Sequence, residues 1–110
     1  MIWLDEAAYF LGGGLIANAV PHLVRGMTGH AFQTPFAKPS GKGLSSSTVN
    51  VLWGFLNLVA AYGLICWVGS FSPRSFDMLP PAIGALLIGL FSARHFGAFH
   101  GGNISHPSKS

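Results

Sequence analysis

The sequence predicts an all-α integral membrane protein with three transmembrane helices and a single membrane domain, 1–110. Charged residues make up 8% of the chain, whereas soluble domains contain about 25%. Half of the residues are hydrophobic. Three runs lack charge, 7–24, 43–73 and 78–93, and a helix of about 20 apolar residues crosses a bilayer.

The central span, predicted at 49–69, is the clearest of the three. Trp53 and Trp67 lie toward its two ends, and amphipathic rings favour the membrane interface. Residues 45–48 precede it and offer hydroxyl groups that can cap the free N–H groups of a helix.

The first span is predicted at 5–24. Asp5 and Glu6 fall in its first turn, where the helix dipole favours negative charge. A signal peptide begins with basic residues, whereas this span begins with acidic ones. We therefore expect that the first span is not cleaved off as a signal peptide. Pro21 is expected to bend or end this helix because it removes a backbone donor.

The loop at 25–48 contains two prolines and four glycines, which argue against a long helix. Phe32 and Phe36 lie between Arg25 and Lys38, a pattern that favours a loop lying on the lipid headgroups. A structureless loop of this length is uncommon, and such loops are often functional.

The third span is predicted at 78–97. Asp77 followed by Pro80 and Pro81 is typical of a helix start, and Arg94 can extend its charge to the interface. The polar tail, 101–110, is predicted to be disordered.

The distribution of basic residues predicts an orientation. Five of the six fall on the side of the middle loop and the C-terminus: Arg25, Lys38, Lys42, Arg94 and Lys109. Positive residues stay cytoplasmic. The N-terminus is therefore expected outside and the C-terminus inside, with the loop 25–48 cytoplasmic.

Several polar residues of the predicted spans gather toward their cytoplasmic ends. With about 1.5 Å of rise per helical residue, four of them are expected at a similar depth: His22, Asn50, Arg94 and His95. Intramembrane polar groups usually face the bundle interior and pair there. The sequence thus predicts a polar layer that either latches the helix ends together or binds a headgroup such as a quinone or a lipid.

Two further asparagines, Asn18 and Asn57, are expected deeper in the bilayer. On the central span, Asn57 shares a face with Asn50, Gly54 and Ala61. Amides commonly join membrane helices through hydrogen bonds worth about 1 kcal/mol or less. Interhelical bonding is therefore the favoured interpretation of these asparagines, and a substrate path is the alternative.

The histidines do not form a recognisable ligand set for haem or a metal. His95 and His100 are five residues apart and so lie on different faces of a helix. Neither His-x-x-x-His nor Cys-x-x-Cys occurs. We therefore expect no metal and no cofactor.

A candidate contact for a lipid phosphate precedes the central span: Lys38, Lys42, Ser45 and Ser46. The spacing of a phosphate-binding loop is not met, because Gly43 follows Lys42. The free N–H groups at a helix start attract anions, so lipid phosphate is the functional interpretation. A turn followed by a helix cap is the simpler one.

Small residues recur every four positions along the third span: Ala85, Gly89, Ala93 and Gly97. Small residues let membrane helices approach closely. We expect this seam to pack against the first two spans, and packing against a partner is the alternative.

Three segments carry a resemblance: 18–22 (Asn-Ala-Val-Pro-His), 34–39 (Thr-Pro-Phe-Ala-Lys-Pro) and 49–58 (Val-Asn-Val-Leu-Trp-Gly-Phe-Leu-Asn-Leu). They resemble small, uncharacterised bacterial multi-pass inner-membrane proteins. The resemblance covers well under half of the chain. It implies a bacterial inner-membrane location and no particular activity.

No catalytic constellation is recognisable, and a net charge of +3 without a basic stripe argues against nucleic acid as a partner. We expect a small non-catalytic subunit or scaffold that contacts the lipid bilayer and either another membrane protein or its own copies. An oligomeric small-solute transporter or channel ranks second, since no acidic residue is expected at the midplane. A haem- or quinone-binding membrane subunit ranks third.

Overall fold

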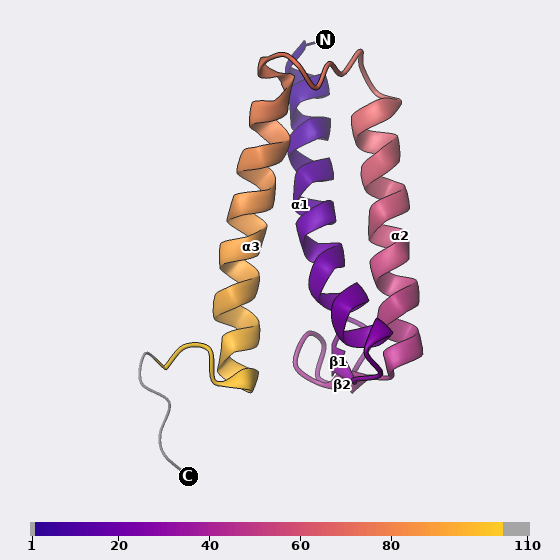
Figure 1. Ribbon diagram of the computed structural model, residues 1–110, viewed down its shortest axis with the longest axis vertical. Helices are drawn as coiled ribbons and strands as arrows, with labels where there is room; N and C mark the ends of the chain where they lie inside the picture. The colour runs from indigo at the N-terminus through magenta and orange to yellow at the C-terminus, as the bar shows by residue number, and fades with distance from the viewer. Residues whose placement is uncertain (1, 105–110) are drawn as a thin grey trace.

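The computed structural model describes residues 2–104 and places three long helices side by side (Figure 1). The elements, in order, are α1 (Ile2–Met27), β1 (Phe32–Gln33), β2 (Leu44–Ser45), α2 (Ser47–Cys66), the 3-10 helix η1 (Phe76–Met78) and α3 (Leu79–His100). The chain is mostly helical, and all three long helices are long and apolar enough to cross a membrane.

The helix α1 is the centre of the arrangement. It packs against both α2 and α3, whereas α2 and α3 scarcely touch each other (Figure 1). The C-terminal ends of α1 and α3, the N-terminal end of α2 and the two strands all lie at one end of the bundle. This end carries the polar layer predicted from the sequence.

Glycines bring α1 and α3 into backbone contact. A Cβ on Gly13 would overlap the carbonyl group of Pro81, and a Cβ on Gly84 would overlap that of Phe10. Small residues permit this approach. The three consecutive glycines of α1 therefore serve packing, with Gly12 facing Ile65 of α2 while Gly13 faces α3.

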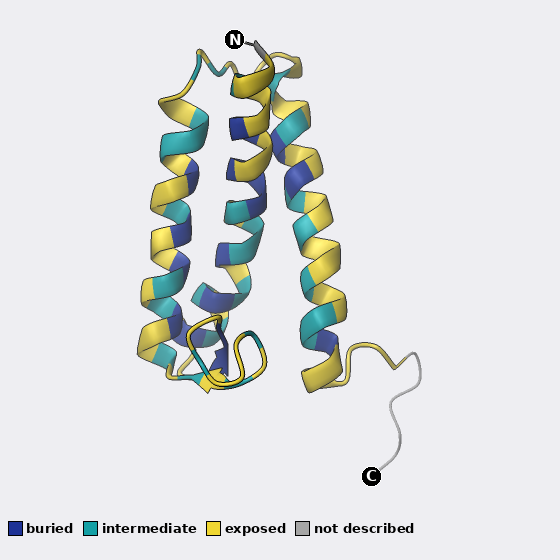
Figure 2. Ribbon diagram, turned by 180° about the vertical axis from the view of Figure 1, so that it is seen from behind, coloured by how far each residue is buried: buried dark blue, intermediate teal, exposed yellow. Residues whose placement is uncertain are grey.

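The predicted small-residue seam of α3 is not the surface that packs within the chain. Gly89 and Ala93 are exposed, and a Cβ on Gly89 would meet nothing within 4 Å. The face toward α1 instead contains Pro81 and Gly84, and the rest of α3 is largely exposed (Figure 2). The expectation of an intrachain seam is wrong at Gly89 and Ala93 because α3 turns a neighbouring face toward α1.

The middle loop also differs from the prediction. It is not structureless but folds into a hairpin whose strands β1 and β2 pair antiparallel, Phe32 with Ser45 and Gln33 with Leu44. Phe32, Gln33 and Thr34 are at most 4% exposed. The hairpin lies at the end of the bundle where α2 and α3 diverge, and this position accounts for its burial (Figure 1).

The helix boundaries shift from the predicted ones by a few residues. Helix α1 continues through Pro21 to Met27, and its axis turns aside in the last turns (Figure 1). Helix α2 runs over 47–66 rather than 49–69, and α3 extends beyond 97 to 100, where Gly101 ends it with a φ of 81°. The predicted disordered tail lies outside the described residues from 105 onward, as does Lys109.

Candidate functional site

Two buried side chains join α1 to α2 at the hairpin end. Nδ1 of His22 lies 2.7 Å from Oδ1 of Asn50. The amide nitrogen of Asn50 is bonded to the carbonyl oxygens of Phe32, Ser45 and Ser46 at 3.2, 3.2 and 3.0 Å. Because carbonyl groups only accept, this nitrogen must face them, and Oδ1 accepts from His22 Nδ1.

This pairing determines the tautomer of a neutral His22. When Nδ1 carries the proton, Nε2 has a free lone pair. Within residues 2–104, Nε2 of His22 has no hydrogen-bond partner. His22 therefore combines a structural bond on one side of its ring with an available acceptor on the other.

One helical turn deeper, Asn18 and Asn57 form a second interhelical pair. Nδ2 of Asn57 donates to the carbonyl oxygen of Trp53 at 2.8 Å. Its Oδ1 accepts from Nδ2 of Asn18 at 3.1 Å. Oδ1 of Asn18 is therefore a second acceptor without a partner among the described residues.

The histidines of α3 hold the hairpin rather than the other helices. Nε2 of His95 donates to the carbonyl oxygen of Gly41 at 2.6 Å, and Nε2 of His100 lies 3.0 Å from Oε1 of Gln33. Arg94 is exposed and takes no part, although its carbonyl oxygen accepts from Asn103. The predicted layer thus brings His22 and Asn50 together, adds His95 through the hairpin, and leaves Arg94 outside.

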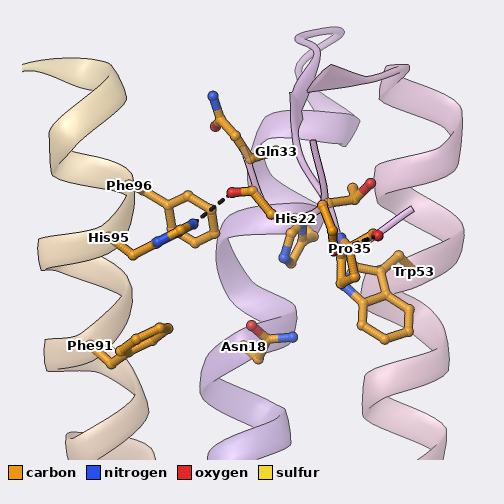
Figure 3. Close-up of a pocket in the computed structure, with 11 residues that line it drawn as sticks. Asn18, His22, Gln33, Pro35, Trp53, Phe91, His95 and Phe96 are labelled. Atoms are coloured by element: carbon orange, nitrogen blue, oxygen red, sulfur yellow. Dashed lines mark hydrogen bonds between the residues drawn. The ribbon is translucent and has the colours of Figure 1, made fainter. Parts of the chain in front are cut away.

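A chamber of about 250 Å³ lies between these groups (Figure 3). All three helices and the hairpin contribute to its wall, and none of the contributed side chains is basic or acidic apart from the two histidines. The lining residues are Asn18, His22, Gln33, Thr34, Pro35, Ser40, Gly41, Trp53, Phe91, His95 and Phe96. Eight of these were not selected from the sequence, because the hairpin and the aromatic side chains carried no motif.

Trp53 has an uncommon feature among the residues that line the chamber. Its Nε1 is buried and has no hydrogen-bond partner within residues 2–104. Most buried polar side-chain atoms in proteins are bonded. Because Nε1 has essentially no accessible surface, it does not open onto the chamber, and the unpaired polar groups of the wall are two acceptors, on His22 and Asn18.

An apolar groove of about 330 Å³ adjoins the chamber. Asn18 and Phe91 line both. From Asn18 the groove follows α1 back to Phe10, a distance of about 12 Å at 1.5 Å per helical residue. Its remaining wall is aliphatic or aromatic: Leu11, Gly14, Leu15, Leu64 and Ile88. Together the two cavities are polar at the hairpin end and apolar toward the middle of the helices.

The residues proposed to contact lipid phosphate divide into two groups. Lys38 and Lys42 are exposed at the hairpin end. Ser46 caps α2, its hydroxyl accepting from the Val49 amide at 3.2 Å, and the hydroxyl of Ser45 is bonded to that of Thr34. The two serines therefore have partners within the chain, although Ser46 is exposed like the two lysines.

Among residues 2–104, no group of three or more His, Cys, Asp and Glu side chains is arranged to hold a metal ion. Comparisons with models of protein families, with curated proteins and with solved structures found no match to this chain. The resemblance to small bacterial membrane proteins stays a prediction.

Proposed function

We propose that this protein binds an amphipathic small molecule that resides in the membrane. The observation that carries the proposal is the junction of the two cavities at Asn18 and Phe91. A polar head would occupy the chamber at the hairpin end, and an apolar chain would lie in the groove along α1. Ligand sites of this kind are mostly apolar, with a few convergent polar groups.

The helix arrangement supports entry from the bilayer. Because α2 and α3 scarcely touch each other, no contact between these two helices closes the groove that runs over α1. An amphipath already dissolved in the membrane could enter sideways, without taking its chain through water. No catalytic step is proposed.

This proposal develops the third interpretation of the sequence, a ligand-binding membrane subunit, but without haem. The expected role as a subunit or scaffold of a larger assembly stays a prediction, as does the transporter. The exposed Gly89 and Ala93 on α3 are open equally to lipid and to another helix.

Blocking the groove is expected to weaken ligand retention. Leu11→Trp places a large ring in the space proposed for the apolar chain, and we expect a loss of at least about tenfold in affinity, which corresponds to ~1.4 kcal/mol. Native mass spectrometry of the detergent-purified protein would measure the fraction that carries a bound amphipath. Leu86→Trp is the matched control, because Leu86 is 61% exposed and lines neither cavity. Equal retention in the two variants would contradict the proposed site.

We further propose a bacterial inner membrane as the location, with the N-terminus outside and the C-terminus inside. Four of the basic residues in the described part of the chain lie at the hairpin end: Arg25, Lys38, Lys42 and Arg94. All three acidic residues lie at the opposite end of the bundle. Basic flanks stay cytoplasmic.

This orientation predicts that an impermeant thiol reagent labels the two ends differently in intact cells. Ala31→Cys and Ser72→Cys, each in a Cys66→Ala background, place single exposed thiols at the hairpin end and at the opposite end. We expect labelling of residue 72 from outside and of residue 31 only after lysis. The reverse pattern would invert the proposed orientation.

A further inference from the structure

We infer that the head of the ligand is an aromatic ring bearing hydroxyl groups, as in a hydroquinone. This inference rests on the proposed function, because it specifies the head that the chamber accepts. Three properties of the chamber support it: the unpaired acceptors of its wall, its lack of charge and the aromatic rings that surround it.

The unpaired acceptors require a ligand that donates. Nε2 of His22 is an acceptor because Nδ1 donates to Asn50, whose own orientation is set by three carbonyl groups. Oδ1 of Asn18 is an acceptor because its amide nitrogen donates to Asn57. A quinone or an ether offers only acceptors, so it would leave both atoms unpaired.

Hydroxyl groups can satisfy both acceptors. A hydroxyl group donates one hydrogen bond. A ring with two hydroxyl groups can therefore donate to Nε2 of His22 and to Oδ1 of Asn18, both on α1.

The charge of the chamber excludes a phosphate head. No lysine, arginine, aspartate or glutamate lines it. The basic side chains of the hairpin end also lie outside the lining: Lys38 and Lys42 are exposed, and the guanidinium of Arg25 lies over the ring of Phe32. Burying an anionic head without a cation is expensive, so the occupant should be neutral.

The walls of the chamber favour a flat ring. The imidazole of His22 meets the rings of Phe96 and Trp53 edge to face, at centroid distances of 6.0 and 6.4 Å and interplanar angles of 87° and 75°. On α3, Phe91 and His95 stack at 5.7 Å. Aromatic rings pair well in edge-to-face and offset geometries, so an aromatic head would find partners on all three helices (Figure 3).

The test compares three probes that share a decyl chain: a hydroquinone kept reduced, the corresponding benzoquinone and the hydroquinone dimethyl ether. Binding to the detergent-purified full chain would be measured by native mass spectrometry and by calorimetry. One unmet hydrogen bond corresponds to roughly 3- to 10-fold in affinity. We expect the hydroquinone to bind about tenfold more tightly than either other probe.

The outcomes separate this inference from the function on which it rests. Equal affinity for the three probes, with all three blocked by Leu11→Trp, would overturn the hydroxyl assignment and leave the amphipath site standing. Tighter binding of a decyl glycerol ether than of the hydroquinone would overturn the aromatic assignment. Failure of every probe to bind would overturn both proposals.

Discussion

Replacing Gly84 by alanine is expected to separate α3 from α1 or to unfold the bundle. The added Cβ would overlap the carbonyl oxygen of Phe10. Because that oxygen belongs to the helix backbone, no rotamer change can make room for the methyl group. Overpacking typically costs about 1–3 kcal/mol, and we expect the upper end of that range here.

Gly89→Ala is the matched control on the same helix. A Cβ at this position would meet nothing within 4 Å, and alanine is about 1 kcal/mol more favourable than glycine inside a helix. Thermal unfolding in detergent, followed by circular dichroism, should show a large fall in melting temperature for Gly84→Ala and none for Gly89→Ala. A similar fall in both variants would contradict the assignment of the Gly84 face of α3 as the face that contacts α1.

Replacing Asn50 by leucine is expected to release the hairpin from the bundle. Asn50 is fully buried and bonds to His22 and to the carbonyl groups of Phe32, Ser45 and Ser46. Leaving a buried polar group unpaired costs about 1–3 kcal/mol. Leucine at this position removes the partner of His22 Nδ1 and one partner each of the Phe32 and Ser45 carbonyl groups, whereas the Ser46 carbonyl group still accepts from the backbone amide of residue 50. We expect a loss of at least about 3 kcal/mol in the free energy of unfolding.

Limited proteolysis reports on the hairpin directly. The backbone amide of Lys42 is bonded to the carbonyl oxygen of Pro39 at 3.0 Å within the turn, so release of the hairpin should accelerate tryptic cleavage after Lys42. Thr48→Leu, at an exposed position two residues away, controls for the added apolar side chain. Unchanged cleavage in Asn50→Leu would show that the hairpin is held mainly by His95 and His100 of α3.

The sequence by itself determined the three apolar helices and the polar face of α2. The helices follow from uncharged runs of sufficient length, which is a local property. The shared face of Asn50, Gly54, Asn57 and Ala61 follows from the helical period, and these are the buried residues of α2. The depth of His22 and Asn50 followed from the rise per residue, and the structure pairs them.

The tertiary structure alone decided which face of α3 packs and where the hairpin lies. Helical period groups Gly89 with Ala93, but it does not select between that row and the row of Pro81 and Gly84, because both consist of small or apolar residues. The selection depends on the backbone of α1 at Gly13.

The chamber depends on contacts that no local pattern predicts. Phe32 and Gln33 become buried because α2 and α3 diverge around α1 and because His95 and His100, more than 50 residues away, hydrogen-bond to the hairpin. Glycine and proline in the loop indicated only that it is not helical. The unpaired acceptors of His22 and Asn18 face one space because long-range packing places three helix faces and one hairpin around it.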